Sequence, residues 1–222
     1  MKKILIYIIL SASVFCVSAQ NIEQVFINFP DLYIPLLSKE KRAELLFNHN
    51  VAKTDTIVNN FKGTSKLLIL DTENNFLKLE LTEKSKFEMK IWTLNDTVRF
   101  VGFSHTVCAP VCDSRVAFFN MNFKRLDTDK NQMFPDIAIQ DFLNKEKIAA
   151  DGKNLENMVK KHDALFATIT FQPNSDNILL KSHAKEFLSA EVYADIEPYL
   201  IGNFIELIFE NGIFKKGVAT WK

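Results

Sequence analysis

Glycine and proline are scarce in this sequence, with six of each among 222 residues. This scarcity argues against disordered, collagen-like and glycine-rich repeat architectures. An excess of charge of either sign is also missing, because 27 basic residues balance 27 acidic ones. Strong electrostatic attraction to nucleic acid or to anionic lipid is therefore excluded as the main activity. No catalytic, metal-binding or cofactor-binding motif occurs in the sequence, so no catalytic residue, metal or cofactor is predicted.

The first nineteen residues have the pattern of a secretion signal. Lys2 and Lys3 form a short positive region, Ile4–Leu10 is apolar, and Val17–Ala19 supplies the small residues needed for cleavage. The apolar run is too short and too close to the cleavage site for an expected membrane span. We expect a mature chain that begins at Gln20, carries 25 basic and 27 acidic residues, and is periplasmic or extracellular.

Aromatic residues are abundant, with 20 phenylalanines in a chain that is 47% hydrophobic and 24% charged. These proportions describe an ordinary folded protein. So many phenylalanines indicate either a thick aromatic core or a surface that binds a partner through aromatic side chains. Cysteine is rare, since Cys16 leaves with the signal and only Cys108 and Cys112 remain. Two neighbouring cysteines in an oxidising compartment predict one disulfide.

The N-terminal half is expected to begin with two helices and to continue as strands. Asn21–Asn28 can form the first helix, and Ser38 is a suitable N-cap for a second helix that runs to about Asn50. From Thr64 onward apolar and polar residues alternate, which is the pattern of half-buried strands. The expected strands lie within Leu67–Leu70, Leu77–Leu81, Phe87–Ile91, Thr97–Val107 and Ser114–Phe123.

These segments predict an antiparallel meander of about five strands, because the connections are too short for parallel crossovers. Where alternation is clean, one face of such a sheet should be polar and in contact with water. Lys84, Lys86 and Lys90 are accordingly expected on the solvated face of a strand pair.

The polar stretch 127–153 contains Pro135 and Gly152 and is the expected connecting segment. It would separate a lobe of residues 20–126, which holds the meander, from a second lobe of residues 154–222. Both lobes combine helices with antiparallel strands, so the predicted fold class is α+β.

The second lobe is expected to contain two antiparallel hairpins and a helix. Leu165–Phe171 alternates as a strand and returns through Ile178–Leu180. Glu186–Tyr199 has helical spacing and is ended or kinked by Pro198. The dipeptide Asn211–Gly212 favours the positive φ angles of a type I′ turn and predicts the final hairpin.

Several short segments of the sequence together carry a resemblance to a known family. They are Phe29–Asp31, Leu36–Lys39, Asn60–Ser65, Glu88–Lys90, Thr106–Arg115, Leu188–Glu191 and Pro198–Leu200. With these segments the chain resembles the DUF3256 family of exported Bacteroidales proteins of unknown function. The resemblance implies a Gram-negative cell envelope or exterior, and it implies no activity.

The stretch from Ser104 to Arg115 concentrates the reactive side chains. The candidate functional loop consists of His105, Asp113, Ser114 and Arg115 around the two cysteines. In the structural interpretation, a Cys108–Cys112 disulfide closes a hairpin loop, with the two Cα atoms about 4.4–6.8 Å apart. A three-residue loop prefers glycine in the left-handed position, for which Val111 is a poor choice.

Three other interpretations of this stretch stay open. A redox site would need a CxxC pair at a helix N-terminus, whereas CAPVC has one residue more and lies between strands. A zinc site could use His105 and the two cysteines but lacks a fourth ligand nearby. Nucleophilic catalysis would need Ser104 or Ser114 to share a proton with His105, and Ser104 and His105 point to opposite faces of a strand.

The sequence as a whole favours a binding or interaction module of the cell envelope, with a protein or small molecule as its partner. An exposed aromatic patch or a concave apolar surface would be the physical basis of such binding. One alternative is a secreted hydrolase whose site is assembled from distant residues. Another is an envelope assembly factor that holds client chains against an exposed sheet edge.

Overall fold

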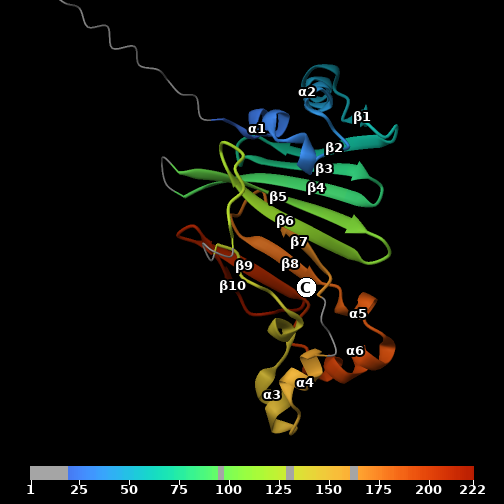
Figure 1. The fold of residues 1–222 in the computed structure, drawn as a ribbon, viewed down its shortest axis with the longest axis vertical. Helices are drawn as coiled ribbons and strands as arrows, with labels where there is room; N and C mark the ends of the chain where they lie inside the picture. Colours follow the sequence, from blue (N-terminus) through green and yellow to red (C-terminus); the bar gives the residue numbers. More distant parts are fainter. Residues whose placement is uncertain (1–19, 95–97, 129–132, 161–164) are drawn as a thin grey trace, which may run out of the picture.

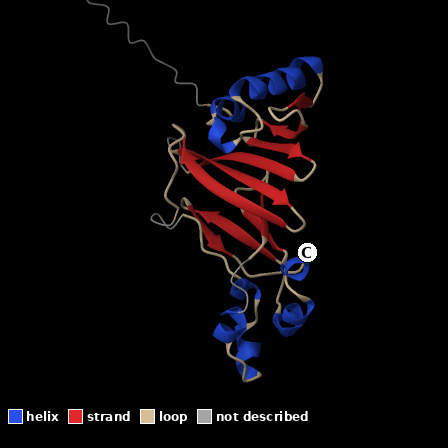
Figure 2. Cartoon of the chain, turned by 45° about the vertical axis from the view of Figure 1, so that its right-hand side comes forward, coloured by secondary structure: helices blue, strands red, loops and turns tan. Residues whose placement is uncertain are grey.

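The computed structural model describes residues 20–94, 98–128, 133–160 and 165–222. Two N-terminal helices cover one face of a six-stranded sheet, and a four-stranded sheet lies beneath its other face (Figures 1 and 2). Further helices gather at the lower end of the molecule. The predicted α+β fold with antiparallel strands is confirmed, and the expected signal, residues 1–19, lies outside the described residues.

The N-terminal helices begin where the sequence predicts. Asn21 caps the first one in a reciprocal capping box with Gln24, and the Ser38 side chain accepts a hydrogen bond from the Lys41 backbone N–H of the second. Both caps satisfy backbone donors that a helix terminus leaves unpaired. The elements are α1 (Ile22–Asn28), the 3₁₀ turn η1 (Asp31–Tyr33), α2 (Lys39–Phe47) and the π turn η2 (Asn48–Ala52).

The first sheet is an antiparallel meander in sequence order, with six strands where about five were expected. The strand that the sequence does not reveal has only three residues, too few to show alternation. The strands are β1 (Thr56–Val58), β2 (Thr64–Asp71), β3 (Phe76–Thr82), β4 (Ser85–Thr93), β5 (Arg99–Cys108) and β6 (Cys112–Asn120).

The second sheet has the order β10-β9-β8-β7 and is also antiparallel. Its last hairpin turns at Asn211 and Gly212, whose φ angles of 51° and 86° confirm the predicted type I′ turn. The strands are β7 (Ala167–Phe171), β8 (Ile178–Ser182), β9 (Phe204–Glu210) and β10 (Ile213–Lys216).

Two hydrophobic cores lie on opposite faces of the first sheet. The upper core joins α1 and α2 to side chains such as Leu77, Phe87 and Met89. The lower core surrounds Trp92 and joins the first sheet to the second, with Phe171 and other side chains contributed by the second sheet. Since the two sheets share this core, the central parts of β4 and β5 and the second half of β6 are covered on both faces. The division into lobes at residues 127–153 stays a prediction.

Short helices at the lower end pack around a third core that includes Ile148, Ile196 and Tyr199. The single helix expected over Glu186–Tyr199 is divided, because Ser189 caps a new helix and Pro198 lies in a final 3₁₀ turn. No helix among the described residues is long and apolar enough to cross a membrane. The elements are η3 (Ile139–Phe142), α3 (Lys145–Ala150), α4 (Leu155–Lys160), α5 (Ala184–Phe187), α6 (Ala190–Ile196) and η4 (Glu197–Tyr199).

Candidate functional site

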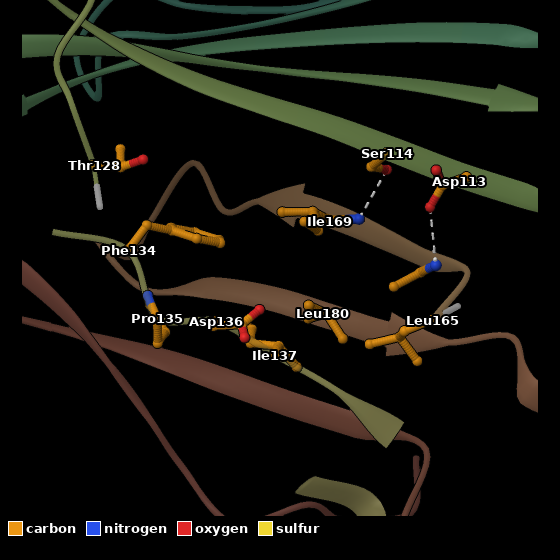
Figure 3. A pocket seen from close by; sticks show the side chains of 11 residues that line it. Asp113, Ser114, Thr128, Phe134, Pro135, Asp136, Ile137, Leu165, Ile169 and Leu180 are labelled. Atoms are coloured by element: carbon orange, nitrogen blue, oxygen red, sulfur yellow. Dashed lines mark hydrogen bonds between the residues drawn. The ribbon is translucent and has the colours of Figure 1, made fainter. Parts of the chain in front are cut away.

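Strand β7 is an edge strand of the second sheet, and side chains of β6 bind its outer backbone groups. Asp113 Oδ1 accepts a hydrogen bond from the Ala167 backbone N–H at 3.2 Å, and Ser114 Oγ accepts one from the Ile169 N–H at 2.9 Å (Figure 3). Two of the four predicted loop residues therefore meet the second sheet directly. They hold the edge of β7 against the start of β6.

Further along the same edge, Glu88 of β4 binds β7 from inside the protein. Its Oε2 accepts a hydrogen bond from the Phe171 backbone N–H at 2.7 Å, and Lys78 Nζ lies 2.7 Å from its Oε1. Ser104 of β5 donates to the Ile169 carbonyl at 2.6 Å. Burial raises the pKa of the Glu88 carboxyl, and the hydrogen bond and charge of Lys78 oppose this effect.

We predict that this carboxyl makes stability depend on pH. Because its folded-state pKa is raised, the folded chain keeps a proton on Glu88 at pH values where the unfolded chain has lost it. The free energy of unfolding should therefore fall as the pH rises from the ordinary glutamate value of 4.5 through the raised pKa. Urea titrations at a series of pH values should show a shallower fall for Glu88→Gln. Exposed Glu83→Gln is the control, and an unchanged slope in Glu88→Gln would contradict the prediction.

The prediction that Lys90 lies on a solvated face is wrong. Lys90 has 3% of its surface exposed, and its ammonium donates to the backbone carbonyls of Gln172, Pro173 and Ser175 at 2.9–3.1 Å. Burial lowers the pKa of Lys90, and nearby Asp176 opposes this shift. The second sheet covers this face, so the lysine replaces water with the carbonyls of the β7–β8 turn. Lys84 and Lys86 are exposed as expected.

Beside the Asp113 and Ser114 contacts, the protein has a cleft of about 830 Å³ (Figure 3). Its floor is the inner face of β7 and β8, where Ala167, Ile169 and Leu180 are buried. One wall is the start of β6, and the other is the segment from Phe134 to Ile137. The complete lining is Asp113, Ser114, Thr128, Phe134, Pro135, Asp136, Ile137, Leu165, Ala167, Ile169 and Leu180.

The cleft combines an apolar floor with acidic walls. Asp113 and Asp136 are both exposed, on opposite walls, while Leu165 and Ile137 are half-buried. Among the described residues that line it, none is lysine, arginine or histidine. Such a surface suits a ligand with apolar groups and a group that carries positive charge.

His105 lies elsewhere, on the face of β5 that carries Phe103 toward the helices. Its Nε2 is 2.8 Å from Ser85 Oγ, a contact with a serine that the sequence did not suggest. Burial lowers the pKa of His105, and so does the charge of Arg115 across the strand pair. Neither His105 nor Ser85 lines the cleft, and the described residues give the other ring nitrogen no carboxylate partner. The pair is therefore a packed cross-strand contact.

The predicted disulfide joins Cys108 and Cys112 at the end of the β5–β6 hairpin. Their Cα atoms are 3.9 Å apart, closer than the expected range, because the two residues form a directly opposed pair in the ladder. The loop contains a cis Ala109–Pro110 peptide, and Val111 does not adopt a positive φ. With both sulfurs bonded to each other, neither is available as a zinc ligand beside His105. Within the described ranges, no cluster of three His, Cys, Asp or Glu side chains could hold a metal.

Most of the described phenylalanines are buried, so the aromatic excess mainly builds the cores. Trp92 is fully buried, in ring contact with Phe100, Phe118, Phe171 and Phe214. Among the described residues, the exposed large aromatic side chains are Phe47, Phe61, Phe187 and Trp221, which are far apart in the sequence.

Sequence reasoning missed the wall formed by Phe134–Ile137, because it assigned these residues to a polar connecting segment. Apolar residues within that stretch could have indicated a buried segment. They are Met133, Phe134, Ile137 and Ile139. Met133 and Ile139 are buried, and the Phe214 backbone N–H donates to the Met133 carbonyl. The segment crosses the second sheet and closes one side of the cleft.

No curated protein is significantly similar to the chain. A solved structure described as a domain of an uncharacterized protein from Porphyromonas gingivalis W83 has the same fold, with a TM-score of 0.71. It is 20% identical, and the match covers 90% of this chain and 99% of that one. Residues 14–214 match the family described as protein of unknown function (DUF3256). Because the match spans most of the sequence, the chain belongs to the DUF3256 family.

Proposed function

We propose that the protein is a non-catalytic binding protein of the cell envelope and that it holds its ligand in the cleft between the two sheets. The cleft itself carries this proposal, since an apolar floor with a few polar side chains at the walls is typical of ligand sites. Its volume of about 830 Å³ lies within the usual range for such sites.

The polar groups of the cleft favour binding over hydrolysis. Ser114 Oγ is 2.7 Å from Thr106 Oγ1 and accepts a hydrogen bond from the Ile169 N–H, and no histidine lies among the cleft residues described. A serine nucleophile needs a base within hydrogen-bond reach. Asp113 is likewise bound to the β7 backbone. These side chains position the walls and floor.

Binding of the uncharged fluorescent dye Nile red tests the cleft. We expect one dye molecule to bind per chain, because the apolar floor is open to a flat apolar molecule. A carboxylate in the cleft should weaken binding roughly tenfold or more, since burying it costs several kcal/mol. The variants are Ile137→Glu and Leu165→Glu, and Leu68→Glu on exposed β2 is the matched control. Equal dye affinity in all three variants would refute the cleft as the site.

We also propose that residues 1–19 direct export and are removed, as the resemblance to exported Bacteroidales proteins implies. The signal pattern supports this proposal, and so does the disulfide, because disulfides persist in oxidising compartments. N-terminal sequencing of the protein from a fractionated native host should give Gln20 as the first residue, in the envelope or the medium. Recovery of the intact chain from the cytosol with free thiols would contradict export.

A further inference from the structure

We propose that the ligand is an extended polypeptide segment that adds to β6 as a further antiparallel strand. This inference depends on the proposed function and specifies its ligand. The segment would present apolar side chains to the cleft floor and, on its other face, a basic residue opposite Asp113 and an acidic residue opposite Arg115.

Within the described part of the chain, no strand pairs with the outer edge of β6 where it borders the cleft. Near its end, the Leu126 backbone N–H donates to the Phe118 carbonyl at 2.8 Å, so the backbone groups of Phe118 point outward. Because the register is unbroken along β6, the N–H and C=O groups of Ser114 and Val116 point to the same side. Among the described residues, Leu126 makes the last backbone hydrogen bond to β6 on this side, and no backbone group bonds Ser114 or Val116 there.

The outer edge of β7, in contrast, has its backbone N–H groups bonded to side chains of the first sheet. There, the outward N–H groups of Ala167, Ile169 and Phe171 each receive a side-chain acceptor. An uncovered strand edge is a ready template for another chain. Since Ser114 also lines the cleft, a strand added to β6 would lie along the cleft wall.

The two faces of β6 determine which side chains the added strand should carry. Ser114 and Val116 face the second sheet, so residues opposite them would point toward the apolar floor. Asp113 and Arg115 alternate with them on the opposite face of β6 and are both exposed, and the Asp113 carboxylate reaches past the strand edge to the Ala167 N–H. Opposite charges directly across an antiparallel pair are stabilising, and like charges are destabilising. An antiparallel partner strand should therefore carry four side chains in this order along its own sequence: apolar opposite Val116, acidic opposite Arg115, apolar opposite Ser114 and basic opposite Asp113.

The test uses the acetylated and amidated hexapeptide Thr-Val-Glu-Val-Lys-Thr, measured by displacement of Nile red and by isothermal titration calorimetry. We expect it to bind and to displace the dye. A version with exchanged Glu and Lys should bind about three- to fivefold more weakly, because both cross-strand charge pairs become repulsive. N-methylation of the two residues whose amides face β6 should weaken binding roughly tenfold or more, since the backbone hydrogen bonds are lost.

A charge reversal at Arg115 separates strand addition from nonspecific binding. Arg115→Glu should weaken binding of the hexapeptide, and replacing its Glu with Lys should restore binding to that variant. Exposed Lys66→Glu on β2 is the matched control and should change neither affinity. Folding of each variant is checked by its Nile red affinity, which should stay unchanged.

The outcomes distinguish this inference from the proposal on which it depends. If Nile red binds in the cleft but the hexapeptide does not, or if N-methylation or charge exchange has no effect, strand addition is overturned and the cleft remains a site for a small apolar ligand. If neither the dye nor the peptide binds, the proposed function fails as well. Peptide-independent dimerisation through β6 would identify a second copy as the occupant and would also overturn the inference.

Discussion

Replacing Arg42 with methionine is expected to lower the free energy of unfolding by about 3–5 kcal/mol. The side chain of Arg42 is fully buried, and its guanidinium donates to the backbone carbonyls of Ile27, Phe29 and Leu37. It also lies 2.8 Å from the Asp31 carboxylate. Methionine fills similar space but leaves three carbonyls without their donor, which is costly in a site closed to water.

Urea unfolding followed by circular dichroism measures this loss. Lys39→Met is the matched control, because Lys39 lies on the same helix and is exposed, and its change should stay within about 0.5 kcal/mol. Arg42→Lys keeps the charge but cannot reach all three carbonyls, so it should fall between the two. A loss in Arg42→Met no larger than in the control would show that water satisfies these carbonyls.

Lys90→Met should destabilise the protein by about 2–4 kcal/mol, because the hydrogen bonds of a charged donor to three carbonyls are lost. Those carbonyls belong to Gln172, Pro173 and Ser175, which follow β7. Asp176, 3.6 Å from the ammonium, would also lose its cation. The effect should be smaller than at Arg42, since Asp176 is half exposed and water can reach part of the turn.

Lys86→Met is the control for Lys90, because it removes the same group from an exposed position on the same strand. Urea midpoints should separate the two variants clearly. We also expect weaker Nile red binding in Lys90→Met. β7 forms part of the cleft floor, and without the Lys90 hydrogen bonds the turn after β7 would lose much of its attachment to the first sheet. Equal stability of both variants would mean that the buried lysine is dispensable.

Local features of the fold were predictable from the sequence because neighbouring residues determine them. Asn21 and Ser38 cap helices through their own side chains, and the turn at Asn211 needs residues that tolerate positive φ. The alternation around Leu77 and Phe87 predicts strands, and the short connections between these strands predict that they are antiparallel. The three-residue strand β1 escaped prediction because its pairing with β2 depends on a distant segment.

The candidate site was predictable only in part. Asp113 and Ser114 belong to the stretch in which the sequence concentrates reactive side chains, and the structure places both on the cleft wall. Their bonds to β7 depend on residues more than fifty positions away in sequence, which no local pattern encodes. The Phe134–Ile137 wall was hidden in a segment whose average polarity indicated a linker.

The sequence alone determined the helix caps, the strand pattern, the disulfide pairing and the family. Tertiary structure decided which polar residues face water, because alternation marks two faces of a strand without saying what covers each one. Lys90, which the alternation predicts to be solvated, and Glu88 on the same face of β4 are both buried, since β7 and its turn bring backbone groups that replace water as their partners. The same docking of one sheet on the other creates the cleft, which exists in neither half of the sequence by itself.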